Sequence, residues 1–197
     1  TACMVQDKMG AKHAGAMDIS AGCSGYIYAV ACASNMVKAG MYDNVLVIGA
    51  EILSRLVDWQ DRSTCILFGD GAGAAVIGQV DEGYGLLASE LGSDGSLGKI
   101  LNIPASGVAE PVTHRAIDSK RIYIHMEGSE VFKAAVRHMG QTTLSTLEKA
   151  GITKEDINMF IAHQANDRII QSLAKKLSIP SDRMYVNVDR YGNTSAA

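Results

Sequence analysis

Short, fully apolar runs alternate with longer segments of helical periodicity, and this alternation constrains the fold more than any other feature of the sequence. The clearest run, residues 45–50 (VLVIGA), is typical of a strand buried on both faces. Residues 24–39 are apolar almost all the way round, which predicts a buried helix that stops at Gly40. Strands and helices in alternation predict a layered α/β protein with a mostly buried, mixed sheet.

Further elements follow from the same patterns. An apolar stripe predicts a helix over residues 127–150 closed by Gly151, and Thr153 with Asp156 resembles a capping pair. Asn166 is suited to cap a last helix, which Pro180 ends and which buries Ile169, Ile170, Leu173, Ala174 and Leu177. Further strands are expected at residues 16–20, 65–68, 72–79, 86–91, 157–162 and 185–188.

The pattern of elements repeats from Gly83 onward, so we expect two units, residues 1–82 and 83–197. The opening at Thr1 and the ending YGNTSAA are typical of the interior of a domain, which predicts a fragment cut at both ends. No signal peptide and no apolar run near ~20 residues is present, which argues against secretory and membrane classes.

Charge and cysteine usage exclude further classes. The chain has 18 basic and 21 acidic residues, a net charge of −3, so no basic excess points to nucleic acid or an anionic membrane surface. A hydrophobic fraction of 47% is enough for a sizeable core. The four cysteines form no C-x-x-C pair, which suits a reducing compartment such as the cytoplasm.

Cys23 occupies the junction between an apolar run and the predicted buried helix. A helix start concentrates unpaired N–H groups and partial positive charge, which favours thiolate over thiol and can hold a developing oxyanion. The adjoining residues 21, 22, 24 and 25 are small and leave room for a substrate beside the sulfur. A structural cysteine at a packed turn fits this segment equally well. The other cysteines are expected to be packing residues: Cys3, Cys32 and Cys65.

His163 and Asn193 lie at two further junctions of the same kind. His163 follows the predicted strand 157–162 and precedes a helix, and Asn193 follows the predicted strand 185–188. Taken singly, the histidine fits a structural role and the asparagine fits a helix cap. Three chemically capable side chains at three strand ends favour an active site, because active sites of α/β proteins collect at such edges.

Metal and nucleotide motifs are lacking in the sequence. The remaining histidines have no ligand spacing, so we expect no metal site: His13, His114, His125 and His138. Residues 69–74 satisfy G-x-G-x-x-A, but the following AAVIGQV resembles a strand and offers no helix start for a pyrophosphate. We therefore exclude a dinucleotide site and expect no cofactor.

Four segments, in this order, resemble the beta-ketoacyl-acyl-carrier-protein synthase III family. They are DISAGCSGYIYA around Cys23, DRSTCILFGDGAGAAV from Asp61, IAHQANDRII around His163 and RYGNTSAA around Asn193. The resemblance covers essentially the whole chain. It implies a thiolase-like layered αβαβα fold of two similar halves with mixed five-stranded sheets, incomplete here, in a homodimer.

The resemblance also implies roles for single residues. The catalytic cysteine, histidine and asparagine of the family fall on Cys23, His163 and Asn193. Contacts to coenzyme A fall on Arg62 and Asn166, and Met126 matches a residue near the acyl pocket, although packing explains it equally well. The carrier-protein-binding stretch corresponds to Gln164, Ala165, Asn166, Asp167 and Arg168, with Arg168 as the charged contact.

The implied reaction starts fatty acid synthesis. An acyl group moves from acyl-coenzyme A to Cys23, and a decarboxylative Claisen condensation with malonyl-acyl-carrier protein then gives a 3-oxoacyl product. Acyl-coenzyme A and malonyl-carrier protein are substrates, so no bound cofactor is implied. Residues 163–197 hold five basic and three acidic residues, which suits an acidic carrier protein.

Alternatives stay open at this point. Related acyltransferases and quinolone or polyketide-type synthases share the fold and much of the pattern. A truncated, inactive pseudo-enzyme is the non-enzymatic alternative, because the family's N-terminal coenzyme A contacts and C-terminal glycine-rich segment are not among these residues. A papain-like protease also orders Cys, His and Asn along the chain, but its C-G-[SA]-C-[WY] signature is absent.

Overall fold

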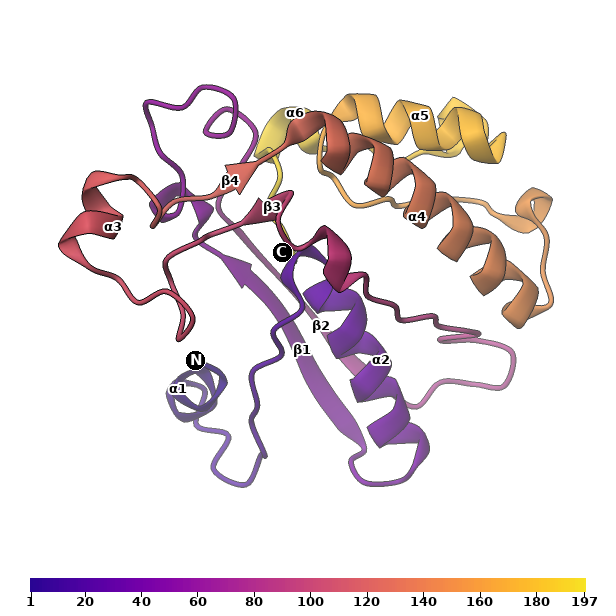
Figure 1. The fold of residues 1–197 in the computed structure, drawn as a ribbon. Helices are drawn as coiled ribbons and strands as arrows, with labels where there is room; N and C mark the ends of the chain where they lie inside the picture. Colours follow the sequence, from indigo (N-terminus) through magenta and orange to yellow (C-terminus); the bar gives the residue numbers. More distant parts are fainter.

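A two-stranded antiparallel ribbon with one helix packed on it organises the first part of the molecule (Figure 1). The computed structural model describes residues 1–197. Strand β1 (Asn44–Glu51) pairs with β2 (Gly71–Gly78), from Asn44 opposite Gly78 to Glu51 opposite Gly71. Helix α2 (Gly25–Lys38) contacts both strands. This packing buries Val47 together with Ala33 and Val37 of the helix.

Two long helices form the second packed body. Helix α4 (Gly128–Ala150) lies beside α5 (Asp167–Leu177), and Gly140 of α4 faces the aliphatic stem of Lys176 (Figure 1). The buried face of α5 is the one that the sequence predicts, and its side chains pack with Ala162, Ile179 and Met184 into a core cluster. The amphipathic pattern therefore predicted both this helix and the face that it buries.

Short elements connect these bodies. The remaining helices are α1 (Ala2–Lys8), α3 (His114–Asp118) and α6 (Val188–Tyr191), and β3 (Leu101–Asn102) pairs antiparallel with β4 (His125–Met126). Five single-turn 3-10 helices lie at Gly22–Ser24, Leu53–Arg55, Gly95–Leu97, Lys154–Asp156 and Ser181–Arg183. None of the helices has the combination of length and apolar character needed to cross a membrane.

Several predicted boundaries are confirmed. Strands form at residues 45–50 and 72–79 with ends shifted by a residue or two, and α2 stops beside Gly40. Gly151 closes α4 with a left-handed backbone, φ +69°. Thr153 and Asp156 form the expected capping box. Helix α5 ends at Leu177, before Pro180 is reached, because Ser178 adopts a left-handed backbone conformation (φ +56°) that terminates it.

Five predicted strands were wrong. Residues 16–20, 65–68, 86–91 and 157–162 form no strand beyond single bridges at Phe68 and Phe160. Residues 185–188 run into α6. An apolar run indicates burial, whereas a strand also needs a neighbouring backbone to pair with. The expected five-stranded mixed sheets are accordingly seen as two antiparallel pairs and two parallel bridges.

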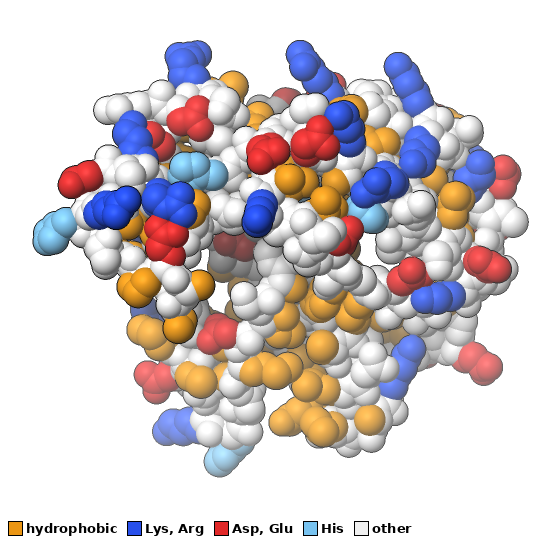
Figure 2. All heavy atoms as spheres, viewed as in Figure 1, with side chains coloured by type: hydrophobic (Ala, Val, Ile, Leu, Met, Phe, Trp, Pro, Cys, Tyr) orange, Lys and Arg blue, Asp and Glu red, His pale blue; other side chains and the backbone are white.

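Burial of the first body is one-sided, contrary to the prediction of a fully buried strand and helix. Leu46 and Ile48 of β1 are each 41% exposed, and Ile27 of α2 is 59% exposed. Figure 2 shows apolar side chains gathered over the region of α2, while Lys and Arg side chains line the edge where α4 and α5 lie. All four cysteines are free thiols, and Cys3 is exposed rather than packed.

Backbone contacts join the regions before and after Gly83. Phe68 and Asn193 form a parallel bridge, and the Ile124 N–H donates to the Leu56 carbonyl at 2.8 Å. Through these contacts, Ile124 and Asn193 lie next to residues 56 and 68 of the region before Gly83. The division at residues 1–82 and 83–197 stays a prediction.

Candidate active site

Cys23 lies at the start of the central helix, as predicted. It sits in the 3-10 turn Gly22–Ser24, which continues directly into α2. Gly22 adopts φ +53°, so the backbone reverses just before the cysteine. The Cys23 side chain is half-buried. The preceding residues 16–20 are exposed and extended without pairing, so the junction is a loop-to-helix junction and not the expected strand-to-helix junction.

The environment of Cys23 favours the neutral thiol. Burial raises the pKa of the Cys23 thiol, and the carboxylate of Glu51 adds to the rise. A hydrogen bond with Ser195 and the backbone N–H of Cys23 itself lower the pKa, but the net direction is upward. The helix start therefore does not by itself give a resting thiolate, contrary to the prediction, and a base has to remove the proton before the sulfur can attack.

Asn193 is placed by a close approach of two backbone segments. Its N–H donates to the Leu67 carbonyl at 2.8 Å, and its carbonyl accepts from the Gly69 N–H at 3.0 Å. Gly192 has φ +68° and ψ −164°, a conformation that is essentially restricted to glycine. The segment from α6 thereby turns onto residues 67–69 and brings Asn193 with it.

The Asn193 side chain is oriented by its own turn. Its Oδ1 accepts the Ser195 N–H at 2.9 Å. Asn193 is only 7% exposed. Its Nδ2 makes no hydrogen bond within the protein, and no fully buried side-chain nitrogen lacks a partner, so this N–H₂ group retains contact with solvent. With one end of the amide fixed, Asn193 presents a hydrogen-bond donor that is already oriented.

The turn at residues 193–197, which begins at Asn193, lies against the start of α2. The Ser195 side chain lies close enough to the Cys23 thiol to lower its pKa. At the start of α2, a methyl group on Gly25 would stand 3.3 Å from the Ala196 Cβ, which places the turn directly against the helix. Ser195 was missed by sequence reasoning, and its left-handed backbone (φ +56°), unusual for serine, gave no sequence signal.

His163 is half-buried just before helix α5. Burial lowers the pKa of the His163 imidazole, so the ring is neutral at pH 7. No hydrogen bond joins its side chain directly to Cys23 or Asn193. The connection runs through the next residue, because the Gln164 side chain accepts the Asn187 N–H at 2.9 Å and Asn187 precedes α6.

The other predicted site residues lie at separate places. Arg62 is exposed in the turn after Asp61 and makes no ion pair, and Met126 is half-buried in β4. Asn166 caps α5, with Oδ1 accepting the Ile169 N–H at 2.9 Å. Ala165 is half-buried, whereas Asp167 and Arg168 are exposed in the first turn of α5. None of these residues makes a hydrogen bond or an ion pair with Cys23.

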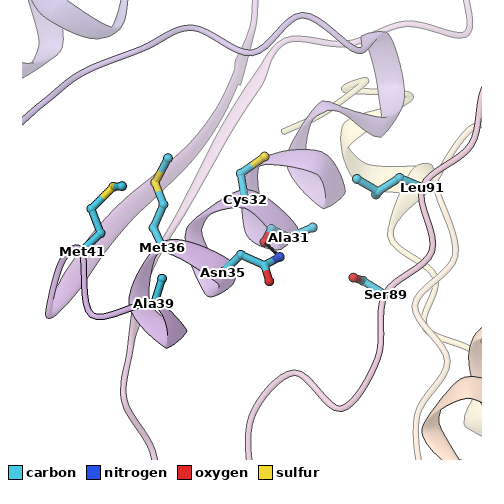
Figure 3. Close-up of a pocket in the computed structure, with 8 residues that line it drawn as sticks. All are labelled: Ala31, Cys32, Asn35, Met36, Ala39, Met41, Ser89 and Leu91. Atoms are coloured by element: carbon cyan, nitrogen blue, oxygen red, sulfur yellow. Dashed lines mark hydrogen bonds between the residues drawn. The ribbon is translucent and has the colours of Figure 1, made fainter.

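A groove on the flank of α2 is distinct from this site. It has a volume of about 430 Å³ and lies between the helix and residues 89 and 91 (Figure 3). Cys32 and Met36 point their sulfur atoms to one side of the helix there, and Asn35 donates back to the Ala31 carbonyl at 2.8 Å (Figure 3). Cys23, His163 and Asn193 do not line it. The groove is a gap in the packing of α2 with no reactive group of the site in it.

Two exclusions from the sequence can be compared with the structure. The glycine motif at residues 69–74 runs into strand β2, so no helix start follows it, as predicted. No group of three or more His, Cys, Asp or Glu side chains is placed to hold a metal ion.

Solved structures resemble this chain over nearly its whole length. The beta-ketoacyl-[acyl-carrier-protein] synthase III of Thermus thermophilus superposes with a TM-score of 0.89 at 48% identity, covering 99% of this chain and 59% of that one. A priming beta-ketosynthase from the R1128 polyketide pathway has a TM-score of 0.82 at 33% identity, covering 99% and 57%. The fold is that of the thiolase-type condensing enzymes, as the sequence resemblance implied.

Sequence comparison narrows this class to one family. The 3-oxoacyl-[acyl-carrier-protein] synthase III model matches residues 17–95, and the model of the C-terminal part of the same family matches residues 147–197. A beta-ketoacyl-[acyl-carrier-protein] synthase III of Caldanaerobacter subterraneus is 55% identical over the whole chain. The chain belongs to the 3-oxoacyl-[acyl-carrier-protein] synthase III family. It spans about 60% of the length of the curated relatives that it matches.

Proposed function

We propose that the protein containing these residues is an acyltransferase that performs the condensation named for its relatives. Cys23 takes an acyl group from acyl-coenzyme A, and the acyl-enzyme then condenses with malonyl-acyl-carrier protein to give 3-oxoacyl-acyl-carrier protein. The observation that supports the proposal is the turn at residues 193–197, which begins at Asn193, packs against the start of α2 through Ala196 and carries Ser195 next to the Cys23 thiol.

The first half-reaction needs a deprotonated Cys23. The thiol proton passes to a base, and the neutral imidazole of His163 is suited to accept it. The sulfur then bonds to the acyl carbon, and the coenzyme A thiolate leaves and takes up a proton. Backbone N–H groups at the helix start, that of Cys23 included, stabilise the oxyanion of the tetrahedral intermediate.

The second half-reaction needs hydrogen-bond donors for an enolate. Malonyl-carrier protein loses carbon dioxide, and the electron pair of the broken bond moves onto the thioester oxygen. His163 and the free Nδ2 of Asn193 donate hydrogen bonds to that oxygen. The enolate carbon attacks the acyl carbon on Cys23, and the sulfur leaves as thiolate. Each step balances without a metal or redox cofactor, so we propose that none is required.

The test is the acyl adduct on Cys23. The full-length protein is incubated with acetyl-coenzyme A, and peptides are then identified by mass spectrometry. We expect one acetylated peptide, carrying Cys23, and none in the Cys23→Ser variant. Cys65→Ser, which changes another half-buried thiol, is the control and should retain the adduct. An adduct on another cysteine, or no adduct in the unaltered protein, contradicts the proposal.

Carrier-protein binding is proposed at the start of α5. Arg168 is exposed and unpaired there, and Lys175 and Lys176 are exposed at the end of the same helix. These three positive charges lie along one helix and would attract an acidic carrier protein. We place coenzyme A contacts at Arg62 and Asn166 and an acyl-pocket contact at Met126, and we expect a cytoplasmic homodimer.

Arg168→Glu is expected to raise the KM for malonyl-carrier protein about tenfold or more, because a reversed charge on a docking surface costs on the order of 1.5 kcal/mol. Acylation of Cys23 by acetyl-coenzyme A should change little. Steady-state kinetics of the two half-reactions measure this difference. Lys12→Glu, an exposed lysine outside α5, is the matched control. Equal loss in both half-reactions would refute the docking role.

The polyketide-type priming ketosynthase is a second candidate activity, which the 33% identity to the R1128 enzyme supports. Both candidates share acylation at Cys23. Competition between carrier proteins of fatty acid and polyketide type for the acylated enzyme distinguishes them.

A further inference from the structure

Residues 160–164 and 183–187 run parallel to each other, and their pairing is interrupted in a specific way. The Phe160 N–H donates to the Arg183 carbonyl at 2.7 Å, and the Phe160 carbonyl accepts the Tyr185 N–H at 3.0 Å. In a regular parallel ladder, the next residue to pair would be Ala162, with the Tyr185 carbonyl and the Asn187 N–H as its partners.

The side chain of Gln164 takes those partners instead. Its Nε2 donates to the Tyr185 carbonyl at 3.1 Å, and its Oε1 accepts the Asn187 N–H at 2.9 Å. The same Nε2 donates to the Ala162 carbonyl at 3.0 Å. The amide of Gln164 thus replaces the peptide group of Ala162 in the ladder and inserts between the two segments.

We propose that Gln164 is a positioning residue that fixes His163 relative to Asn193, an inference that rests on the proposed function. On one side, the bond from Nε2 to the Ala162 carbonyl spans His163 and restrains its backbone. On the other side, Oε1 holds Asn187, the residue before α6.

Helix α6 connects Asn187, which Gln164 restrains, to Asn193. Its four residues, Val188–Tyr191, are about 6 Å long and end at Gly192, directly before Asn193. One side chain therefore restrains both residues that are proposed to stabilise the enolate. Cys23 lies outside this hydrogen-bonded path, since its links run to Ser195 and the start of α2.

This role differs from the carrier-protein contact expected for Gln164. The two donors of its amide point to the carbonyls of Ala162 and Tyr185, and the oxygen accepts from Asn187. Both donors are then engaged inside the protein, and none is left for a carrier protein. A carboxylate at this position would face two carbonyl oxygens without a proton to donate, and a thioether would make none of the three bonds.

The test separates the two half-reactions in the full-length protein. In Gln164→Met, which keeps the side-chain length, we expect the kcat of malonyl-carrier-protein decarboxylation to fall about 100-fold, because that step uses both His163 and Asn193. Cys23 acylation uses only His163 of the two, so it should fall by about tenfold or less. Gln164→Glu should give the same separation. Gln141→Glu, on an exposed position of α4 without a hydrogen-bonded side chain, is the charge-matched control and should leave both rates unchanged.

Each outcome decides the proposal. Decarboxylation at the unaltered kcat in a folded Gln164 variant overturns it, and so does a raised KM for the carrier protein at unchanged kcat, which would assign Gln164 to docking. Retained acylation shows that the variant is folded. If the unaltered protein does not acylate Cys23, the proposed function fails, and hydrogen exchange at Asn187 decides instead. Faster exchange of that amide in Gln164→Met supports the hold, and equal exchange overturns it.

Discussion

Replacing His163 with alanine is expected to slow the decarboxylation of malonyl-carrier protein by about 1000-fold, because the enolate oxygen would lose one of its two proposed donors in a half-buried site. Asn193→Ala removes the other donor and should cost a similar factor. The release of carbon dioxide from labelled malonyl-carrier protein measures both. Since the two donors act on one oxygen, the double variant is expected to lose less than the product of the single losses.

The protonation of His163 adds a pH dependence to this prediction. Burial lowers the pKa of the imidazole below its ordinary value of about 6.5, so the folded protein keeps a neutral ring where a free histidine is already protonated. Acylation of Cys23, which needs the neutral ring as a base, should therefore decline only below pH 6.5. Because the unfolded chain binds the proton first, the free energy of unfolding starts to fall below about pH 6.5 and continues to fall until the pH passes the lower pKa of the folded imidazole.

His13→Ala is the matched control for these measurements, since His13 is exposed and makes no side-chain hydrogen bond. It should leave both half-reactions and their pH profiles unchanged. A His163→Ala variant that decarboxylates at the unaltered rate would contradict the donor role. A folded His163→Ala variant whose acylation keeps the same acid limb would show that another group is the base for Cys23.

Helix α5 illustrates what the sequence could predict. Its five buried side chains share one stripe, and the asparagine before it caps the first turn, so local pattern and tertiary packing agree. The position of helix α2 just after Cys23, its end beside Gly40 and the capping box at Thr153 were also predicted. Features that depend only on neighbouring residues, such as helix caps and amphipathic stripes, could be predicted from the sequence.

The strands were harder to predict because pairing depends on residues far away in the chain. Residues 157–162 are apolar enough for a strand, yet the backbone pairs only at Phe160, since the Gln164 side chain occupies the next partners. Residues 185–188 were expected to form a strand, but α6 begins at Val188. Nothing in a local window reveals that a glutamine two residues after a strand will take the place of its peptide group.

The arrangement of the candidate site could be predicted only in part, and the roles of its residues stay predictions. Cys23 and Asn193 meet through Ser195, a residue without a sequence signal, and His163 is joined to Asn193 through Gln164. The raised pKa of Cys23 was also not predictable, because it depends on burial and on Glu51, which lies 28 positions further along the chain. Motifs identify reactive groups, whereas tertiary contacts decide their protonation.

The second large effect is expected from Gly69→Ala, at the crossing that delivers Asn193. A methyl group at residue 69 would overlap the carbonyl oxygen of Tyr191 and stand 3.2 Å from its carbon. Both partners are backbone, so neither can move aside without breaking the bond from the Gly69 N–H to the Asn193 carbonyl. We expect a loss of roughly 3 kcal/mol in the free energy of unfolding, the upper range for overpacking.

The same substitution should also lower the catalytic rate of the molecules that remain folded. Moving residues 191–193 away from residues 67–69 shifts the Asn193 amide, so decarboxylation should fall about 100-fold even in the folded fraction. Urea unfolding and decarboxylation kinetics of the same preparation measure the two effects. Gly107→Ala, where a methyl group meets nothing within 4 Å, should change the unfolding free energy by less than about 0.5 kcal/mol. A Gly69→Ala variant as stable and active as Gly107→Ala would mean that the backbone crossing does not position Asn193.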